Sequence, residues 1–162
     1  MQIKNNQLKE STEIIREAAK WLINNKNEMW KLEEITEEKI EKSYKKEDIY
    51  VGYINNEPAI TFILQWEDNE FWPNIPNNTS AFLHKIAISR KYSGNNLLKM
   101  ALIEIENICK NKDVYEIRLD CDPNRIKLCN VYENLGFIRV DKKRLNNKID
   151  VAYYKKEIIN GA

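Results

Sequence analysis

The segment from Leu83 to Phe137 constrains the fold more than any other part of this chain. It reads LHKIAI at 83–88, RKYSGNNLL at 90–98, YEIRLDCDPN at 115–124 and LCNVYENLGF at 128–137. The order is a strand, a turn that opens a helix, a second strand, and a second helix that ends before Gly136. A strand, a helix and a further strand in this order predict parallel neighbours joined by a right-handed crossover.

Size and charge are typical of an ordinary globular protein. With 162 residues, we expect one domain over residues 1–162. The 26 basic and 25 acidic residues give a net charge of +1. Because nucleic-acid binders normally show a basic excess, we expect no nucleic-acid partner. No apolar run approaches the roughly 20 residues of a membrane helix, so we expect no membrane partner.

Cysteine and histidine usage indicates the compartment. Cys109, Cys121 and Cys129 form an odd set without a CxxC motif, which favours a reducing compartment over a disulfide framework. A single histidine, His84, cannot build a histidine-based metal cluster. The first ten residues lack the apolar core of a signal peptide. We therefore expect a cytoplasmic protein without a bound metal.

Hydrophobic periodicity divides the chain into alternating elements. We expect helices at about 11–24, 27–44, 94–110 and 125–135. We expect strands at 49–54, 59–66, 81–88, 114–120, 137–140 and 149–155, with a polar and aromatic loop at 67–80. Ser11 or Thr12 is the expected N-cap of the first helix. The fold class predicted is α/β, with helices on both faces of a mixed, mostly antiparallel sheet.

The turn at 90–98 has the composition of an anion-binding helix start. A helix N-terminus carries unpaired amides and partial positive charge, so it attracts phosphate groups. Gly94 allows close approach of the backbone, and Asn95 and Asn96 tolerate left-handed dihedral angles. Taken alone, the same residues also fit an ordinary turn between a strand and a helix.

The combination of this turn with Asn124 and with Tyr132-Glu-Asn-Leu-Gly-Phe137 resembles the GNAT superfamily of acyl-CoA-dependent N-acyltransferases. The resemblance implies acetyl-CoA as the acyl donor and a GNAT-like fold. It implies that Tyr132 protonates the departing thiolate and that Asn124 contacts the cofactor arm. The implied contacts of the strand and the turn with the cofactor are made by Ile86, Ala87, Ile88, Ser93, Gly94, Asn95, Asn96, Leu97 and Leu98.

Acyl transfer to an amine also needs a base, because only the neutral amine is nucleophilic. His84 lies on the strand that would border the thioester, and imidazole titrates near neutrality. A histidine packed in the core is the alternative. Glu70, in the loop before this strand, is a second candidate for the base or for a proton relay.

The loop Trp66–Pro73 is a candidate acceptor site. Glu67 and Asp68 can hold a cationic amine, and Phe71 and Trp72 can form the walls of its pocket. The equally open alternative is a surface loop whose aromatic side chains fill a small core. The whole run from Trp66 to Cys121 resembles one bacterial GNAT subgroup with a DxEFW-like loop.

Other residues near the predicted site receive structural interpretations. Cys121 is expected to be a buried, inert thiol, and Asp120 and Asp122 are expected to serve as cap and turn residues. The pattern departs from the family at Asn96 and Leu98, where small residues are usual. Asn96 can replace a left-handed glycine, whereas Leu98 either crowds the phosphates or turns inward.

The predicted function is transfer of an acetyl group from acetyl-CoA to a primary amine of a small molecule or peptide. The alternative is a non-catalytic acyl-CoA-binding module of the same fold, which the irregular turn favours. A third possibility is a partner protein without a cofactor. Polyamines, aminoglycoside-like compounds, amino acids and protein N-termini all remain open as acceptors. A homodimer is a further possibility, by similarity to the family.

Overall fold

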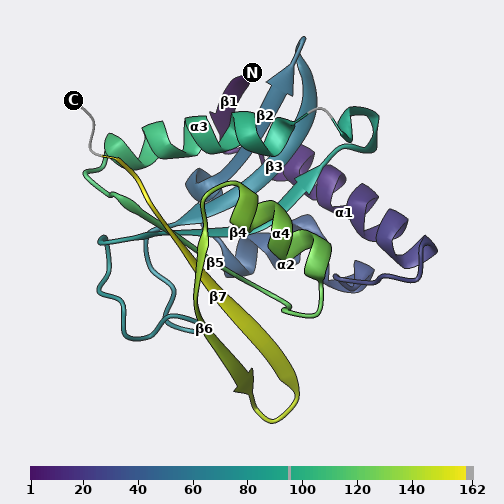
Figure 1. Ribbon diagram of the computed structural model, residues 1–162. Coiled ribbons are helices and arrows are strands. Elements are labelled where there is room, and N and C mark those ends of the chain that lie inside the picture. The colour runs from purple at the N-terminus through teal and green to yellow at the C-terminus, as the bar shows by residue number, and fades with distance from the viewer. Residues whose placement is uncertain (95, 160–162) are drawn as a thin grey trace. The chain divides into compact units, whose positions relative to one another are not determined.

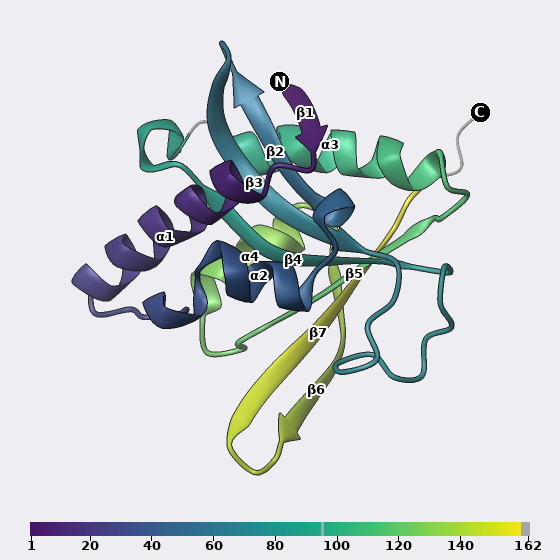
Figure 2. The same cartoon turned by 180° about the vertical axis from the view of Figure 1, so that it is seen from behind.

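The computed structural model describes residues 1–94 and 96–159 (Figure 1; Figure 2 shows the same ribbon from behind). Its contacts group into two compact units. The first contains Met1–Leu64 and His84–Ile105, and the second contains Gln65–Leu83 and the residues from Glu106 onwards. Strand β4 (Ala81–Ile88) and helix α3 (Leu97–Lys110) each begin in one unit and end in the other.

Three antiparallel strands organise the first unit. β1 (Gln2–Asn5) pairs with β2 (Ile49–Ile54), which pairs with β3 (Glu57–Gln65). The predicted hairpin is confirmed, and both turn residues, Asn55 and Asn56, have positive φ values of 49° and 64°. Positive φ at both central positions is the requirement of a type I′ turn, whose twist matches that of the strands.

Helix α1 (Leu8–Asn24) follows β1 and buries one side against β2. Ile14 and Ile15 belong to the same apolar cluster as Val51. The helix begins earlier than predicted, so Ser11 and Thr12 lie inside it and are not its N-cap. Both are buried, and their hydroxyl groups hydrogen bond to Thr61 Oγ1 and to the Leu8 carbonyl group respectively. These bonds offset the cost of burying polar groups in a helix face.

The helix predicted over 27–44 is wrong in extent. The structure instead has a single 3₁₀ turn at Leu32–Glu34 and a short helix, α2 (Glu37–Ser43). Thr36 interrupts the pattern, because its backbone is extended and its Oγ1 accepts the N–H of Lys39 at 3.2 Å. Arg16 of α1 then fixes the irregular part by donating to the carbonyl oxygens of Leu32 and Ile35 at 3.0 and 2.7 Å.

The second unit is built on a mixed sheet. β4 runs parallel to β5 (Glu116–Cys121), with Ala81 opposite Ile117. β5 is antiparallel to β7 (Ile149–Glu157), and β7 is antiparallel to β6 (Ile138–Leu145). The parallel pairing predicted for the segment 81–120 is therefore confirmed, as is the α/β class with a mixed sheet.

The last helix and hairpin differ from the prediction mainly in length. α4 (Ile126–Asn134) ends before Gly136, whose φ of 97° allows the chain to reverse, and the N–H of Phe137 returns to the carbonyl group of Tyr132 at 3.0 Å. β6 extends five residues beyond the predicted end at 140 because its pairing with β7 continues through charged positions.

Helix α3 buries one side, whose positions are spaced mostly four residues apart and comprise Leu97, Ala101, Leu102, Ile105 and Cys109. Leu98 and Ile108 are only partly buried. Among the described helices, none combines the length and apolar character that crossing a bilayer requires.

Candidate active site

The turn before α3 presents backbone amides on an exposed surface of the first unit. Ser93 and Gly94 are exposed, and Gly94 has a φ of 84°. The carbonyl group of Asn96 accepts the N–H of Met100 at 3.2 Å, so Asn96 is the residue that caps the helix. The N–H groups of the first helical turn have no acceptor within the helix, and their partial positive charge attracts anions. The residues present therefore fit a pyrophosphate.

The left-handed conformation expected of Asn96 is confirmed by its φ of 54°. At Gly94 an added Cβ atom would meet nothing within 4 Å, so the backbone angle and not lack of space favours glycine there. Leu97 is buried and anchors the helix, while Leu98 is half-buried. Asn95, also predicted to contact the cofactor, lies outside the described residues.

The two basic residues of the turn, Arg90 and Lys91, contact other side chains of the protein. The guanidinium group of Arg90 lies 3.7 Å from the centre of the Trp21 ring, and its backbone N–H donates to a carboxylate oxygen of Glu17. Lys91 Nζ lies 2.6 Å from Glu57 Oε2. The backbone of the turn is thus held in place by side chains from α1 and β3.

Strand β4 departs from regular strand geometry in its middle. Lys85 has a φ of 48°, an unusual value for a residue with a side chain, and such strain is typical of functional sites. Burial lowers the pKa of the Lys85 amine, which lies 5.9 Å from the centre of the Trp30 ring. The sequence analysis did not single out Lys85. Ile86, Ala87 and Ile88 follow it at the end of the strand.

His84, the predicted base, is half-buried on β4. Its ring centre lies 5.9 Å from that of Tyr44, with the two planes at 43°. Its Nε2 atom is shielded from solvent. An aromatic neighbour and burial restrict the ring to a narrow range of orientations.

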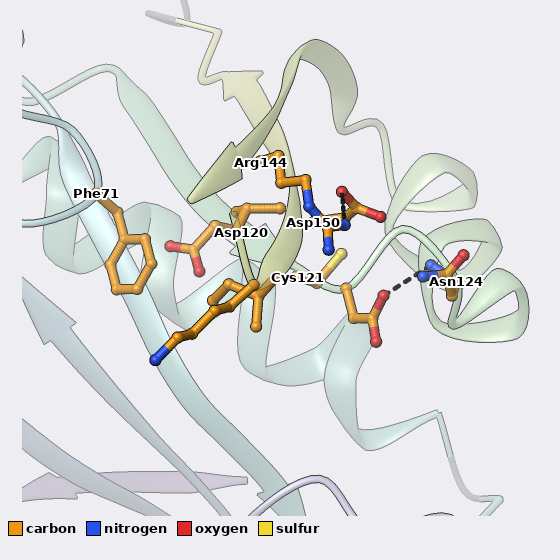
Figure 3. A pocket seen from close by; sticks show the side chains of 10 residues that line it. Phe71, Asp120, Cys121, Asn124, Arg144 and Asp150 are labelled. Carbon is orange, nitrogen blue, oxygen red and sulfur yellow. Dashed lines mark hydrogen bonds and ion pairs between the residues drawn. The ribbon is translucent and has the colours of Figure 1, made fainter. Parts of the chain in front are cut away.

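A cavity of about 450 Å³ lies within the second unit (Figure 3). Its polar lining comes from the end of β5, the following turn and the β6–β7 hairpin, namely Asp120, Cys121, Asp122, Asn124, Arg144, Lys148 and Asp150. Its apolar lining consists of Phe71, Ile149 and Val151. In Figure 3, Phe71 and Asp120 lie on one side of the view and Asn124 on the other. The volume is that of a small-molecule site.

Asp120 has the most unusual carboxyl group of this cavity. Burial first, and then the negative charges of Asp68 and Glu70, raise its pKa from 3.8 to about 6, while the Trp72 indole opposes the shift. A carboxyl group that titrates near neutrality can exchange protons at physiological pH. Sequence reasoning interpreted Asp120 as a cap residue. The sequence indicated that Asp120 lies at the end of a strand. Its raised pKa could not be predicted, because it depends on burial and on Asp68 and Glu70, about fifty residues away.

Tyr132 points its ring into the interior of the same unit. It is 8% exposed, and its ring packs at 67° against Phe137 with the centres 5.9 Å apart. Burial, followed by the nearby Cys121 and Asp120, raises the pKa of its hydroxyl group well above the ordinary value. The phenol therefore stays protonated at any physiological pH. Residues of β5 that line the cavity are close enough to shift its pKa.

The two aromatic residues of the loop before β4, Phe71 and Trp72, have different environments. Trp72 is buried in an apolar cluster, with its ring edge-on to Tyr153 at 4.8 Å, whereas Phe71 lines the cavity. Asp68 is buried, and its Oδ1 accepts the backbone N–H groups of Glu70 and Phe71 at 3.2 and 3.0 Å. The carboxylate therefore shapes the loop. Glu67 and Glu70 are exposed.

The thiol groups near the cavity have the properties of unreactive cysteines. Cys121 Sγ lies 3.8 Å from Cys129 Sγ, and burial raises the pKa of Cys121 to about 12. A thiol held in the neutral form is a poor nucleophile. Cys109 and Cys129 are buried helix residues, as predicted from the sequence.

Comparison with solved structures gives matches over two thirds to nearly all of the chain. An acetyltransferase of the GNAT family from Listeria monocytogenes aligns with a TM-score of 0.77 at 22% identity, covering 97% of this chain and 94% of that one. The ribosomal-protein-S18-alanine N-acetyltransferase from Escherichia coli gives 0.70 at 17% identity, with 99% and 96% covered. A GNAT acetyltransferase from Elizabethkingia anophelis with acetyl-CoA bound gives 0.56 at 17% identity, with 68% and 75% covered.

Sequence comparison identifies the family. No curated protein sequence matches the chain. The model of the acetyltransferase (GNAT) family matches residues 14–137, which is most of the chain and includes both the turn before α3 and Tyr132. The strand, turn and helix signature, the mixed sheet and this match agree: the chain belongs to the acetyltransferase (GNAT) family of acyl-transferring enzymes.

Proposed function

We propose that this protein transfers the acetyl group of acetyl-CoA to a primary amine of a small molecule or peptide. The observation that carries the proposal is the shared environment of Asp120 and Tyr132 in the second unit. One is a cavity carboxyl group with a pKa of about 6, and the other is a buried phenol whose pKa is raised. N-acyl transfer needs both a proton acceptor for the amine and a proton donor for the leaving sulfur.

The protons of the reaction balance with these two residues. Acetyl-CoA supplies an acyl carbon activated by its thioester bond. Asp120 accepts a proton from the ammonium group of the acceptor, which leaves a neutral nucleophilic amine. As the N–C bond forms and the C–S bond breaks, Tyr132 donates its proton to sulfur. Tyr132 is then restored by the second proton of the nitrogen, so one proton is released overall through Asp120.

The remaining predicted residues receive binding roles in this proposal. The amides at the start of α3, flanked by Ser93 and Gly94, bind the pyrophosphate. Backbone groups of Ile86–Ile88 and the side chain of Asn124 bind the arm of the cofactor. The loop with Glu67, Asp68, Phe71 and Trp72 contributes to the acceptor site, where Phe71 already lines the cavity.

Asp120 is favoured over the two bases suggested by the sequence. Glu70 is exposed, and its charge acts on Asp120 by raising the pKa of that carboxyl group. We therefore assign Glu70 a tuning role in place of direct proton transfer. His84 is the alternative base. The pH–rate profiles of Asp120→Asn, Glu70→Gln and His84→Gln distinguish the three, since only loss of the true base removes the acidic limb.

A coenzyme-release assay with a panel of primary amines tests the function itself. We expect release of free CoA thiol that depends on an amine and falls strongly in Tyr132→Phe. Tight binding of acetyl-CoA without release on any amine would instead support a non-catalytic acyl-CoA-binding module.

A further inference from the structure

We infer that the acceptor carries an anionic group, with a carboxylate as the chemistry that fits, in addition to the amine that is acetylated. Lys148, in the turn between β6 and β7, is the residue that binds this group. The inference rests on the proposed function and narrows it from primary amines in general to amino-acid-like amines.

Three charged side chains of the cavity lining, Asp122, Asp150 and Arg144, already have contacts within the protein. Asp122 Oδ1 accepts the backbone N–H of Asn124 at 2.8 Å, so this carboxylate closes a turn. Asp150 Oδ1 lies 3.1 Å from Arg144 Nη1. The same guanidinium group also donates to the carbonyl oxygen of Asn147 at 3.3 Å. These contacts hold the rim of the cavity together: Asp150 and Arg144 offset each other's charge, whereas Asp122 keeps its negative charge.

Two further ionisable groups of the lining have opposite charge when ionised. One is the carboxyl group of Asp120, whose Oδ2 atom is buried and which the Trp72 indole also contacts. The other is the amine of Lys148, which is exposed and has no acidic partner among the described residues.

A ligand with one cationic and one anionic group satisfies both. The carboxylates of Asp68 and Glu70 add negative potential around Asp120, which attracts the ammonium group of the acceptor. A diamine would satisfy Asp120 equally but would offer the amine of Lys148 no anionic partner, and its second ammonium group would repel that amine.

The size of the cavity sets the kind of acceptor. At about 450 Å³ it lies near the lower end of the range for small-molecule sites. Phe71, Ile149 and Val151 supply an apolar wall between the polar groups. An amino acid with an uncharged side chain presents an amine, a carboxylate and an apolar body of matching character.

Matched acceptors test the inference. Coenzyme release is measured at pH 7.5 with a set of amino acids, the carboxamide of each, the decarboxylated amine of each, and aminoalkyl phosphates. We expect kcat/KM to be about tenfold or more higher for the free acid than for its amide, the effect of losing one charge-assisted contact. Preference for the phosphates with the same dependence on Lys148 supports an anionic group and identifies it as phosphate.

Variants of the lysine connect the preference to the residue. In Lys148→Gln the ratio of kcat/KM for acid over amide should collapse toward one, and in Lys148→Arg it should persist. Lys142→Gln removes an exposed lysine of β6 that does not line the cavity and should keep the ratio of the unaltered protein. A ratio that survives in Lys148→Gln overturns the role of Lys148.

The outcomes separate this inference from the proposed function. Release with amides or diamines as good as with free acids overturns the anionic acceptor and leaves the N-acetyltransferase standing. Release with none of the amines, from protein that binds acetyl-CoA, overturns both.

Discussion

Tyr132 on α4 is close enough to Asp120 on β5 for their charges to interact: burial first, and then Cys121 and the carboxylate of Asp120, raise the pKa of the Tyr132 hydroxyl group. The charge of Asp120 therefore adds to burial in keeping the phenol protonated. The proton donor of the proposed reaction is in its protonated form before any substrate binds.

The activity should depend on the ionisation of Asp120. Because the base must be ionised, kcat/KM should rise with pH through the Asp120 pKa of about 6 and level off above it. In Asp120→Asn this limb should vanish and kcat should fall by about 10²–10⁴-fold. Asp141→Asn, an exposed aspartate of β6, should retain the limb. A limb that persists in Asp120→Asn would transfer the base role to His84 or Glu70.

Asp120 should also make stability depend on pH. Its pKa is raised from 3.8 to about 6, so the folded protein holds this proton more tightly than the unfolded chain. The carboxyl group thus favours folding at low pH, and this contribution is lost as pH rises through about 6; at most ~3 kcal/mol is involved. We expect Asp120→Asn to be more stable than the unaltered protein at pH 8 and not at pH 4.

Denaturant unfolding at both pH values measures this effect. Asp141→Asn serves as the control, since it changes the charge by the same amount at an exposed position. An identical stability change for Asp120→Asn at pH 4 and pH 8 would show that the carboxyl group is not perturbed by folding.

Tyr132→Phe should separate chemistry from binding. Loss of the hydroxyl group removes the proton donor while the ring keeps its packing against Phe137, so kcat should fall by about 10²–10⁴-fold. The Kd for acetyl-CoA, measured by calorimetry, should change by less than about threefold, because the hydroxyl group acts on the leaving sulfur. Tyr115→Phe removes a hydroxyl group just before β5 and should be nearly neutral. Equal losses in the two variants would remove the special role of Tyr132.

Asn96 should be replaceable by glycine and not by alanine. At its φ of 54° a Cβ atom costs about 1–2 kcal/mol, which asparagine reduces by local hydrogen bonds. Asn96→Ala should therefore lower the free energy of unfolding by about 1 kcal/mol and weaken CoA binding, whereas Asn96→Gly should preserve both. The same exchange at Asn111, an exposed residue after α3 without positive φ, provides the matched control. Tighter CoA binding in Asn96→Ala would contradict a backbone role.

Cys109 and Cys121 should resist alkylation in the folded protein. Burial raises the pKa of each thiol to about 12, which lowers the thiolate fraction at pH 8 by about a thousandfold relative to an ordinary cysteine. Mass spectrometry after iodoacetamide treatment, with the chain unfolded in urea as the reference, measures the difference. Rapid labelling of Cys121 would identify it as a reactive thiol in the cavity and would reopen covalent catalysis.

Local sequence patterns predicted the elements whose backbone conformation is decided by neighbouring residues. β4 has the predicted bounds, the Asn55-Asn56 turn connects the predicted hairpin, and Asn96 adopts the left-handed conformation expected of it. In each case, the preference of a few neighbouring residues is enough to decide the backbone conformation. The family signature between Leu83 and Phe137 also consists of residue types at short spacing, so it could be recognised from the sequence.

Other features depend on partners far away in the chain. β1 shows too little periodicity to be predicted and forms along the edge of β2, while the irregular segment before α2 is fixed by Arg16. Trp72 is buried whereas Phe71 lines the cavity, because the ring of Trp72 packs against Tyr153, more than eighty residues later. Packing of this kind has no signature within a short window.

The sequence by itself determined the family, the strand and helix order around the cofactor turn, and Tyr132 as the candidate acid, because these depend on residue types at fixed spacing. Only the tertiary structure decided that Asp120 titrates near neutrality and that Lys148 lines the same cavity. A pKa is set by burial and by charges in space, and a cavity by segments that meet only after folding. Neither the pKa nor the cavity can be inferred from residues that are neighbours in the sequence.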